Sequence, residues 1–388
     1  MRKKLAKIAV IHPQLIPGGG SETCAVWTVE ALKEIYDVSL IAMGEINLEV
    51  LNEFYGTSLK ENEITVVEIP IPRLLKNKFD ALRAYKLARF CKKMAPKFDV
   101  MFSSYNLMDF GRAGIQYIVD LSFDDELRRK FDPEPQKANK WFYKKSFLRK
   151  CYIEFAHILS GFSKDGYKKN ITLVVSNWIG KVMKDFYKME TITVYPPIIN
   201  KFPDIPWDSR ENGFLYLGRI STEKQIEKII KVLGQVRKDN INIHLHIVGG
   251  GKDPTYEKFI KNLCEENKNW CSMEGKMRGQ EKLEFIAKHK FGMSARDNEA
   301  SGLAVAEMVK AGCIVFVPNG GGQTEEVGDQ RLIYENIEDA VQKIKAVIKN
   351  EKLQNNLQQR LLMTSQNFSV EIFSRSVRSI VQKFLSDL

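Results

Sequence analysis

The sequence lacks several features that define familiar classes of protein. No apolar run approaches the roughly 20 residues that a membrane-spanning helix needs. The six cysteines are scattered and none forms a Cys-x-x-Cys pair, which disfavours a metal or disulfide framework and fits a reducing compartment. No Ser-His or Cys-His constellation for nucleophilic catalysis is evident. These absences argue against a membrane-spanning protein, a disulfide scaffold and covalent catalysis by a protein nucleophile.

The start of the chain also lacks the marks of a signal peptide. It is basic, and its apolar stretch is short, is interrupted by His12 and Pro13, and is followed by no small-residue cleavage site. We therefore interpret it as a first core strand. A cytoplasmic protein is expected, with peripheral attachment to the inner face of a membrane as a further possibility.

Positive charge is in excess, with 59 Lys and Arg against 48 Asp and Glu and a net charge of +11, which suggests an anionic partner. Two stretches, Arg73 to Lys97 and Arg128 to Lys150, carry nine basic residues each. Both contain aromatics: Phe79, Tyr85, Phe90, Trp141, Phe142, Tyr143 and Phe147. Such segments suit an anionic lipid surface, although solvated helix faces have the same composition. No nucleic-acid motif is present, so we expect no nucleic-acid partner.

The length of 388 residues favours two domains. Short β-branched runs alternate with helical patterns, which indicates an α/β fold of parallel sheets with helical crossovers. Strands are predicted at 7–11, 38–43, 64–69, 100–103, 117–119, 173–176, 214–217, 244–248, 291–294 and 314–317, with helices at 21–35 and 223–236. A proline-rich linker at 194–213 separates predicted domains 1–196 and 197–370, and a helix at 371–388 can return to the first domain.

Glycine-rich turns follow two of these strands. Gly18, Gly19 and Gly20 come after the first strand, and Gly249 and Gly250 follow the strand at 244–248. Glycines permit close approach of a ligand, and the amides at a helix start favour an anion. Neither turn is Gly-x-Gly-x-x-Gly, so each also fits a plain strand–helix connection.

Charged residues follow the strands of the second half. Arg219 and Lys224 come directly after the strand at 214–217, where two cations can hold a diphosphate and neutralise it as it leaves. Glu299 and Glu307 lie eight residues apart, with Gly302 at the predicted helix start between them. Carboxylates accept hydrogen bonds from hydroxyls, so the pair suits a sugar and a ribose. The alternatives are a surface ion pair for Lys224 and a surface helix position for Glu307.

Four segments in order, YLGRISTEK, HIVGGG, EASGLAVAE and AGCIVFVPNGGG, resemble the donor domain of retaining glycosyltransferases of family 4. The shared pattern is Gly-Arg-x4-Lys, a strand ending in Gly-x-Gly, Glu-x7-Glu, and a strand with a Gly-rich loop. The resemblance implies the GT-B architecture, in which two Rossmann-like, doubly wound domains face a cleft. It also implies that a nucleotide-sugar donor is a partner of the chain.

By this resemblance, Arg219 and Lys224 bind the donor pyrophosphate, Glu299 holds hydroxyls of the transferred sugar and Glu307 binds the ribose. The other implied donor-binding residues are Gly18, Gly19, Gly20, Gly249, Gly250, Lys276, Met277, Arg278, Ser301, Gly302 and Leu303. Many relatives carry a histidine after a Tyr-Ile or Tyr-Val pair. Here Asp120 lies near that place and either takes over its contacts or marks the loss of that role. His12 and His157 are expected to be structural.

The implied reaction is metal-independent, retaining transfer of a hexose from a UDP- or GDP-sugar to a glycan or lipid-linked acceptor, without a cofactor. The acidic run Asp124-Asp125-Glu126 is interpreted as a helix start and not as a metal site. Two alternatives stay open: a nucleotide-sugar epimerase of the same fold, and a catalytically silent relative that binds a nucleotide sugar.

Overall fold

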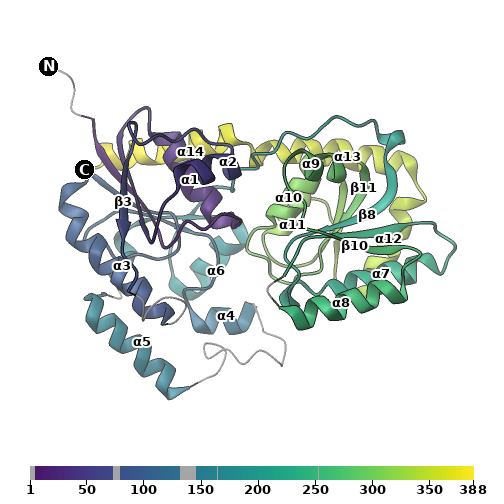
Figure 1. The fold of residues 1–388 in the computed structure, drawn as a ribbon, viewed down its shortest axis with the longest axis horizontal. Helices are drawn as coiled ribbons and strands as arrows, with labels where there is room; N and C mark the ends of the chain where they lie inside the picture. Colours follow the sequence, from purple (N-terminus) through teal and green to yellow (C-terminus); the bar gives the residue numbers. More distant parts are fainter. Residues whose placement is uncertain (1–4, 73–78, 132–145, 164, 252) are drawn as a thin grey trace. The chain divides into compact units, whose positions relative to one another are not determined.

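The computed structural model describes residues 5–72, 79–131, 146–163, 165–251 and 253–388. The chain divides into two compact units. Unit 1 comprises Met1–Arg128, Asn139–Ile199 and Ser369–Leu388, and unit 2 comprises Arg129–Ala138 and Asn200–Phe368. Each unit is built around its own parallel sheet (Figure 1).

Unit 1 contains a seven-stranded parallel sheet in the order β3-β2-β1-β4-β5-β6-β7. Its central strands are continuous apolar runs, and Ile8 to Ile11 are fully buried, as expected where helices cover both faces. The strands are β1 (Lys7–His12), β2 (Asp37–Met43), β3 (Thr65–Ile69), β4 (Val100–Ser103), β5 (Ile115–Ile118), β6 (Ile171–Val174) and β7 (Ile192–Thr193).

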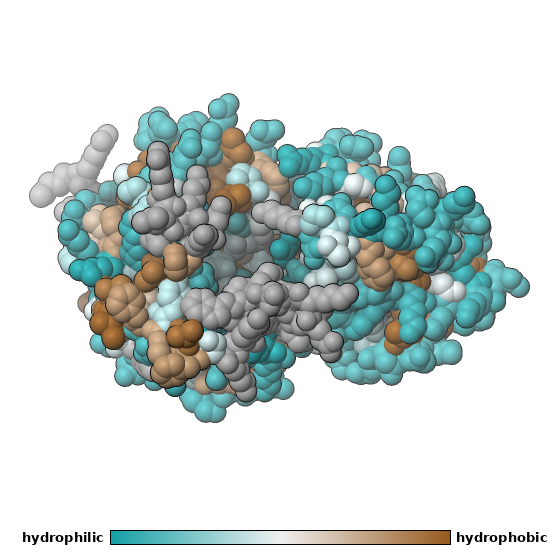
Figure 2. All heavy atoms as spheres, turned by 60° about the horizontal axis from the view of Figure 1, so that its bottom comes forward, coloured by the Kyte–Doolittle hydropathy of each residue, from teal (hydrophilic) through white to brown (hydrophobic). Residues whose placement is uncertain are grey.

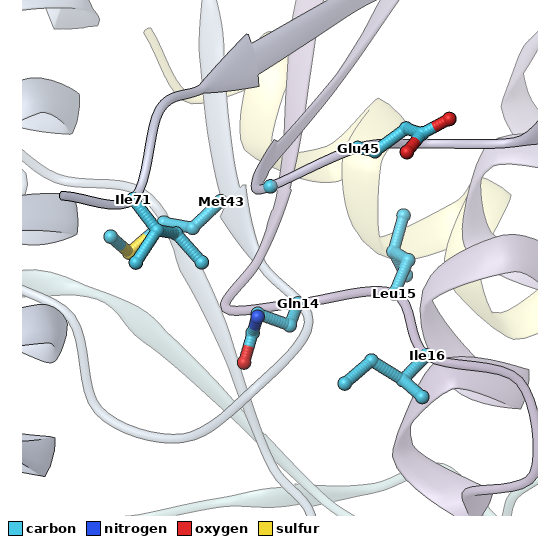
Figure 3. A pocket seen from close by; sticks show the side chains of 7 residues that line it. Gln14, Leu15, Ile16, Met43, Glu45 and Ile71 are labelled. Atoms are coloured by element: carbon cyan, nitrogen blue, oxygen red, sulfur yellow. The ribbon is translucent and has the colours of Figure 1, made fainter. Parts of the chain in front are cut away.

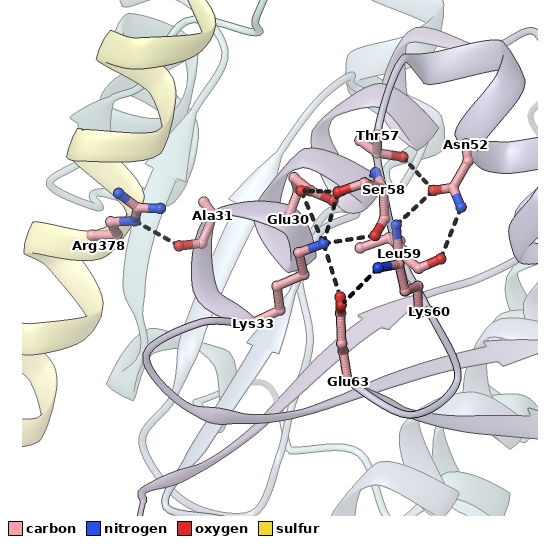
Figure 4. A network of polar contacts seen from close by, with 10 residues as sticks. All are labelled: Glu30, Ala31, Lys33, Asn52, Thr57, Ser58, Leu59, Lys60, Glu63 and Arg378. Carbon is pink, nitrogen blue, oxygen red and sulfur yellow. Dashed lines mark hydrogen bonds and ion pairs between the residues drawn. The ribbon is translucent and has the colours of Figure 1, made fainter.

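The helices that fall wholly or largely in unit 1 are α1 (Gly20–Leu32), α2 (Leu48–Tyr55), α3 (Asp80–Met94), α4 (Asp125–Phe131), α5 (Phe147–Ser160), α6 (Asn177–Tyr187) and α14 (Val370–Ser386). The C-terminal helix α14 packs on α1, as Figure 1 shows. It buries residues at helical spacing, and Arg378 donates to the Ala31 carbonyl at 2.6 Å (Figure 4). In the adjoining network, Lys33 bridges Glu30 and Glu63.

A buried arginine joins three helices of this unit. The Arg149 guanidinium makes two 2.9 Å hydrogen bonds to Asp80 of α3 and one of 2.8 Å to Asp125 of α4. Just before Asp125, Asp124 accepts the Glu126 and Leu127 amides, which makes it the N-cap of α4. The interpretation of this acidic run as a helix start is confirmed.

Unit 2 contains a six-stranded parallel sheet in the order β10-β9-β8-β11-β12-β13. Its strands are β8 (Glu211–Leu217), β9 (His244–Val248), β10 (Cys271–Gly275), β11 (His289–Met293), β12 (Ile314–Pro318) and β13 (Ile333–Tyr334). Its helices are α7 (Ile226–Arg237), α8 (Pro254–Glu266), α9 (Gly279–Ala287), α10 (Leu303–Lys310), α11 (Gln323–Val327), α12 (Ile337–Ile348) and α13 (Glu351–Ser365). Stacked Phe214 and Phe291, 5.1 Å between ring centroids, lie at its core.

Both sheets are doubly wound: the chain first adds strands on one side of the first strand and then on the other. The order reverses between β1 and β4 in unit 1 and between β8 and β11 in unit 2. In open parallel sheets, ligands bind beyond the carboxyl ends of the strands at this reversal. The fold class predicted from the strand–helix alternation is therefore confirmed, and the topology indicates where to look for a site in each unit.

The start of the second predicted helix is wrong. The segment 223–236 was expected to be a single helix, but a 3₁₀ turn covers Thr222–Lys224 and α7 begins at Ile226. Gln225 between them has φ of 52°, in the left-handed region, which interrupts the helical path. The break places Lys224 on a turn beyond the end of β8, and not on the first turn of a helix.

Candidate functional site

The reversal point of unit 2 brings Lys224 and Glu299 together. Lys224 lies on the turn after β8 and Glu299 on the loop after β11, and these strands are neighbours in the sheet. The Lys224 Nζ donates to Glu299 Oε2. Arg296, from the same loop as Glu299, places its Nη1 3.2 Å from the other carboxylate oxygen. All three side chains are more than four-fifths buried.

The charges of this cluster balance around Glu299. Burial works against ionisation of the carboxyl group, but Lys224 and Arg296 outweigh it and leave the pKa of Glu299 below its ordinary value. Burial lowers the pKa of Lys224, and the attraction of Glu299 opposes that shift. Glu299 is therefore ionised at neutral pH. Arg296 was not predicted from the sequence; its only signal was its place in the loop three residues before Glu299.

Arg219 is near this cluster but exposed. Its side chain is 73% exposed, and its Nη2 lies 3.6 Å from Glu223 Oε1. Tyr216 donates to the Arg219 carbonyl at 2.7 Å and so fixes the backbone from which the guanidinium extends. The positive charge of Arg219 also contributes to lowering the pKa of Glu299. The arrangement leaves this cation facing solvent next to a buried charge cluster, where an anionic ligand can reach it.

The predicted glycine loops pack against the backbone of this cluster. A Cβ on Gly249 would lie 1.8 Å from the Gly218 carbonyl oxygen, and one on Gly321 would lie 2.2 Å from that of Glu299. Gly250 is covered by the side chain of Lys276, which follows β10. Because a Cβ on Gly249 or Gly321 would collide with backbone atoms, glycine is required at these two positions for loop packing, whatever ligand the loops hold. Met277 and Arg278 continue the segment after Lys276 up to the start of α9.

The start of α10 already has a carboxyl group of the chain, that of Glu326, bound to it. Gly302 is the N-cap and Leu303 the first residue of α10, so the predicted helix start is confirmed. The Gly302 amide donates to Glu326 Oε1 at 2.8 Å, and the Ser301 hydroxyl lies 3.5 Å from the same oxygen. Burial raises the pKa of Glu326 well above its ordinary value. The sequence predicts these donors as ligand contacts and carries no signal for Glu326.

Glu307, the second predicted carboxylate, lies on α10 with its two oxygens 2.8 and 3.0 Å from the Lys282 Nζ. Asn200 also donates to it at 2.7 Å. Its side chain is largely buried, which excludes the simple surface position considered as an alternative. Neither Lys282 nor Asn200 was singled out from the sequence, because they lie far from Glu307 along the chain.

In unit 1 the glycine turn after β1 is held by a tyrosine. Gly18 has φ of 118°, and its amide donates to the Tyr55 hydroxyl at 3.1 Å. Glu22 folds back over the turn, so that a Cβ on Gly19 would lie 2.0 Å from its carboxylate. Gly20 is the first residue of α1. Burial raises the pKa of Glu22, with a smaller contribution from Asp120.

Asp120 lies beyond the carboxyl end of β5 and is held on three sides. Its carboxylate accepts the Tyr105 hydroxyl at 3.1 Å, the Asn106 amide group at 2.8 Å and the Ser122 backbone amide at 2.8 Å. His12, at the end of β1, is 3% exposed, and burial lowers its pKa to about 4 although Asp120 acts to raise it. The structure thus places His12 near Asp120, a proximity that sequence analysis did not anticipate.

A cavity of about 370 Å³ opens in unit 1 at the carboxyl ends of β1 and β2 (Figure 3). Its lining is mainly apolar and comprises Gln14, Leu15, Ile16, Met43, Gly44, Glu45 and Ile71. Ile16 is 61% exposed, so the cavity presents apolar surface to solvent. A slot of this kind suits an apolar or amphipathic group.

Residues 197–361 match the family of glycosyl transferases group 1. The sucrose-phosphate synthase of Thermosynechococcus elongatus has a similar structure, with a TM-score of 0.69 at 14% identity over 99% of this chain and 100% of that one. HepE of Anabaena in complex with UDP and glucose gives 0.68 at 13%, over 97% and 100%. WaaG, a glycosyltransferase involved in lipopolysaccharide biosynthesis, gives 0.68 at 13%, over 96% and 99%. No curated protein sequence matches the chain.

Proposed function

We propose that this chain, a glycosyltransferase whose residues 197–361 match the group 1 family, moves a sugar from a UDP- or GDP-linked donor to a glycan or lipid-linked acceptor. We further propose that the reaction retains the anomeric configuration and needs no metal. The observation that carries the proposal is the cluster of Lys224, Arg296 and Glu299 at the reversal point of unit 2. The UDP complex of HepE, a structural neighbour, supports a nucleotide donor.

In the proposed reaction the donor C1–O bond to the diphosphate breaks while the acceptor oxygen attacks from the same face. Arg219 and Lys224 stabilise the negative charge on the departing diphosphate, which takes up the acceptor proton. Lys224 uses one of its three N–H bonds on Glu299, so two are left for phosphate oxygens. Glu299, with its charge balanced by Arg296, accepts hydrogen bonds from hydroxyls of the transferred sugar. No protein nucleophile takes part.

A donor panel tests this function. We expect one nucleoside diphosphate sugar, among the UDP, GDP, ADP and TDP derivatives, to raise the melting temperature of the protein, because a ligand that binds only the folded state stabilises it.

Transfer from that donor should continue in EDTA, since Arg219 and Lys224 supply the charge that a metal supplies elsewhere. Loss of transfer in EDTA and recovery with Mg²⁺ would refute metal independence. Formation of an epimerised donor without transfer would instead support the epimerase.

We expect Glu307→Ala to weaken nucleoside diphosphate binding. Loss of a charge-assisted hydrogen bond to the ribose costs about 1.5–3 kcal/mol, which corresponds to roughly 10- to 150-fold in Kd by calorimetry. Lys282→Ala is the matched control, because it removes the same ion pair but keeps the carboxylate. If both variants bind equally well or equally poorly, Glu307 has only a structural role.

We also propose that unit 1 rests on an anionic membrane surface. The outer face of α5 carries Phe147, Leu148, Phe155, Ile158 and Leu159, which are 44–79% exposed. Figure 2 shows apolar side chains, in brown, gathered over this part of unit 1. Their spacing of three, four and seven residues follows one stripe of the helix. Among the described residues no helix combines the length and the hydropathy needed to cross a bilayer.

The basic segments contribute less surface charge than their composition predicted. Arg149 is buried between two aspartates, and Lys92 pairs with Asp109 at 2.6 Å. These cations hold α3, α5 and the neighbouring loop together, so they do not form the anionic-lipid site expected from sequence. Lys93, Lys97, Lys130 and Lys150 are exposed and stay candidates for that site. The predicted contacts of Trp141, Phe142 and Tyr143 lie outside the described residues.

A further inference from the structure

Three of the five histidines gather at the amino-terminal edge of the unit 2 sheet. His244 and His246 lie two residues apart on β9 and therefore on one face of it. His289 begins β11 and is paired in register with Glu211, which begins β8. One ring nitrogen of each histidine and one carboxylate oxygen of Glu211 all lie within 4.8 Å of one another.

Two of the rings are held as metal-binding histidines usually are. His289 is 1% exposed, and its Nδ1 lies 2.7 Å from the Phe285 carbonyl oxygen. A carbonyl only accepts, so Nδ1 carries the hydrogen and Nε2 keeps its lone pair; within the described residues, Nε2 has no hydrogen-bond partner. His246 Nδ1 lies 2.7 Å from Glu274 Oε1. Carbonyl and carboxylate partners of this kind orient metal-ligating imidazoles and fix their tautomer.

Gly213 leaves space for the third ring, that of His244. A Cβ on Gly213 of β8 would lie 2.2 Å from His244 Nε2 and 2.8 Å from His289 Cδ2. His244 Nε2 lies 3.2 Å from Glu211 Oε2, but the two groups are not aligned for a hydrogen bond. Nε2 has no hydrogen-bond partner among the described residues.

We propose that Glu211, His244, His246 and His289 bind one divalent transition-metal ion, and that Zn²⁺ is the best match. Three imidazoles and a carboxylate are typical zinc ligands, and four protein ligands complete a tetrahedral site with no open position. With bonds of about 2.0–2.2 Å, ligand atoms in such a site lie about 3.3–3.6 Å apart. The ligand atoms are up to 4.8 Å apart in the structure, and small movements of the four side chains bring them to this spacing.

The ion has a structural role and takes no part in transfer. The four ligands lie at or near the amino ends of β9, β8 and β11, whereas Lys224 and Glu299 follow the carboxyl ends of β8 and β11. Because β8 has seven residues, the two edges are about 20 Å apart. The ion ties three adjacent strands together on the edge opposite the donor site. This inference is independent of the proposed transferase activity.

Cobalt titration of the full chain tests the site. After EDTA treatment and removal of the chelator, we expect one Co²⁺ per chain to bind, with the intense visible bands of tetrahedral cobalt, and Zn²⁺ to displace it. His244→Ala and His246→Ala should abolish these bands, whereas His157→Ala, a histidine of α5, should keep them. Octahedral-type spectra, or full bands in folded His244→Ala and His246→Ala variants, would overturn the proposal.

A cysteine variant distinguishes the histidine cluster from a cysteine site. The thiols of Cys264 and Cys271, 3.3 Å apart in the same unit, are the competing ligands. Cys264→Ser should keep the spectrum, and a thiolate-to-cobalt charge-transfer band would assign the metal to the two cysteines instead.

Glu274→Gln removes no ligand but should weaken Co²⁺ binding about 10- to 100-fold. Unchanged affinity would contradict the proposed geometry even if the histidine variants misfold. Metal-stripped, folded protein should transfer sugar at the normal rate. Loss of transfer there would contradict both the structural role of the ion and the proposed metal independence, whereas the site itself is tested by the cobalt spectra.

Discussion

Replacing Lys224 with alanine is expected to lower kcat by about 10²–10³-fold, the usual effect of removing one preorganised group that stabilises transition-state charge. Lys224 is one of the two buried cations of the cluster, and its Nζ is held by Glu299 at the reversal point of the sheet. Negative charge on the leaving diphosphate grows as the C1–O bond breaks, so the loss should be larger in kcat than in donor affinity. Steady-state kinetics with the donor identified by the panel measure both.

Lys228→Ala is the matched control. Lys228 lies one turn further along, its side chain is 45% exposed, and its Nζ is 3.5 Å from Asp297. Exposed pairs of this kind contribute little, so the variant should behave like the native protein. Glu299→Gln tests the second half of the cluster, because it keeps the shape but removes the charge that balances Lys224 and Arg296. Native kcat in Lys224→Ala would remove Lys224 from the reaction and leave only Arg219 as the predicted phosphate ligand.

The sequence predicted the strands of both sheets that are rich in β-branched residues, because that pattern directly reflects burial between two helical layers. It missed β7 and β13, which have two residues each, and β10, whose Cys-Ser-Met-Glu-Gly run has no such pattern. It also predicted that Lys224 and Glu299 follow strand ends. Their contact, 75 residues apart, depends on β8 and β11 being neighbours, which the strand order alone determines.

Other parts of the sites could not be predicted, because they arise from packing. The glycine loops were interpreted as ligand cradles, but Gly249 and Gly321 are also required by contacts with the Gly218 and Glu299 backbone. Local sequence cannot reveal such contacts between distant loops. Counting charges along Arg128 to Lys150 treated Arg149 as a surface cation, whereas two aspartates from other helices bury it.

Removing two side chains from the apolar stripe of α5 is expected to weaken membrane binding strongly. Phe155 and Ile158 are 55% and 77% exposed. Seating two such side chains in a bilayer interface contributes about 3 kcal/mol or more, so the double variant F155S/I158S should partition roughly 100-fold less into anionic vesicles. Because neither side chain is buried in the fold, the free energy of unfolding should hardly change. Sedimentation with vesicles of phosphatidylglycerol and phosphatidylcholine measures the partitioning.

The control for this variant is Phe259→Ser, which removes a 45% exposed phenylalanine from α8 of unit 2 and should leave partitioning unchanged. Charge reversal at Lys93, Lys97 and Lys150, all exposed, should weaken binding further. Each cation near an anionic surface contributes about 1 kcal/mol before screening. Added salt should reduce the cationic part of the binding but not the apolar part, so the native protein should keep residual binding that F155S/I158S lacks. A native protein that stays in the supernatant at low salt would show that the stripe has another partner, and the transferase proposal, which depends on unit 2, would be unaffected.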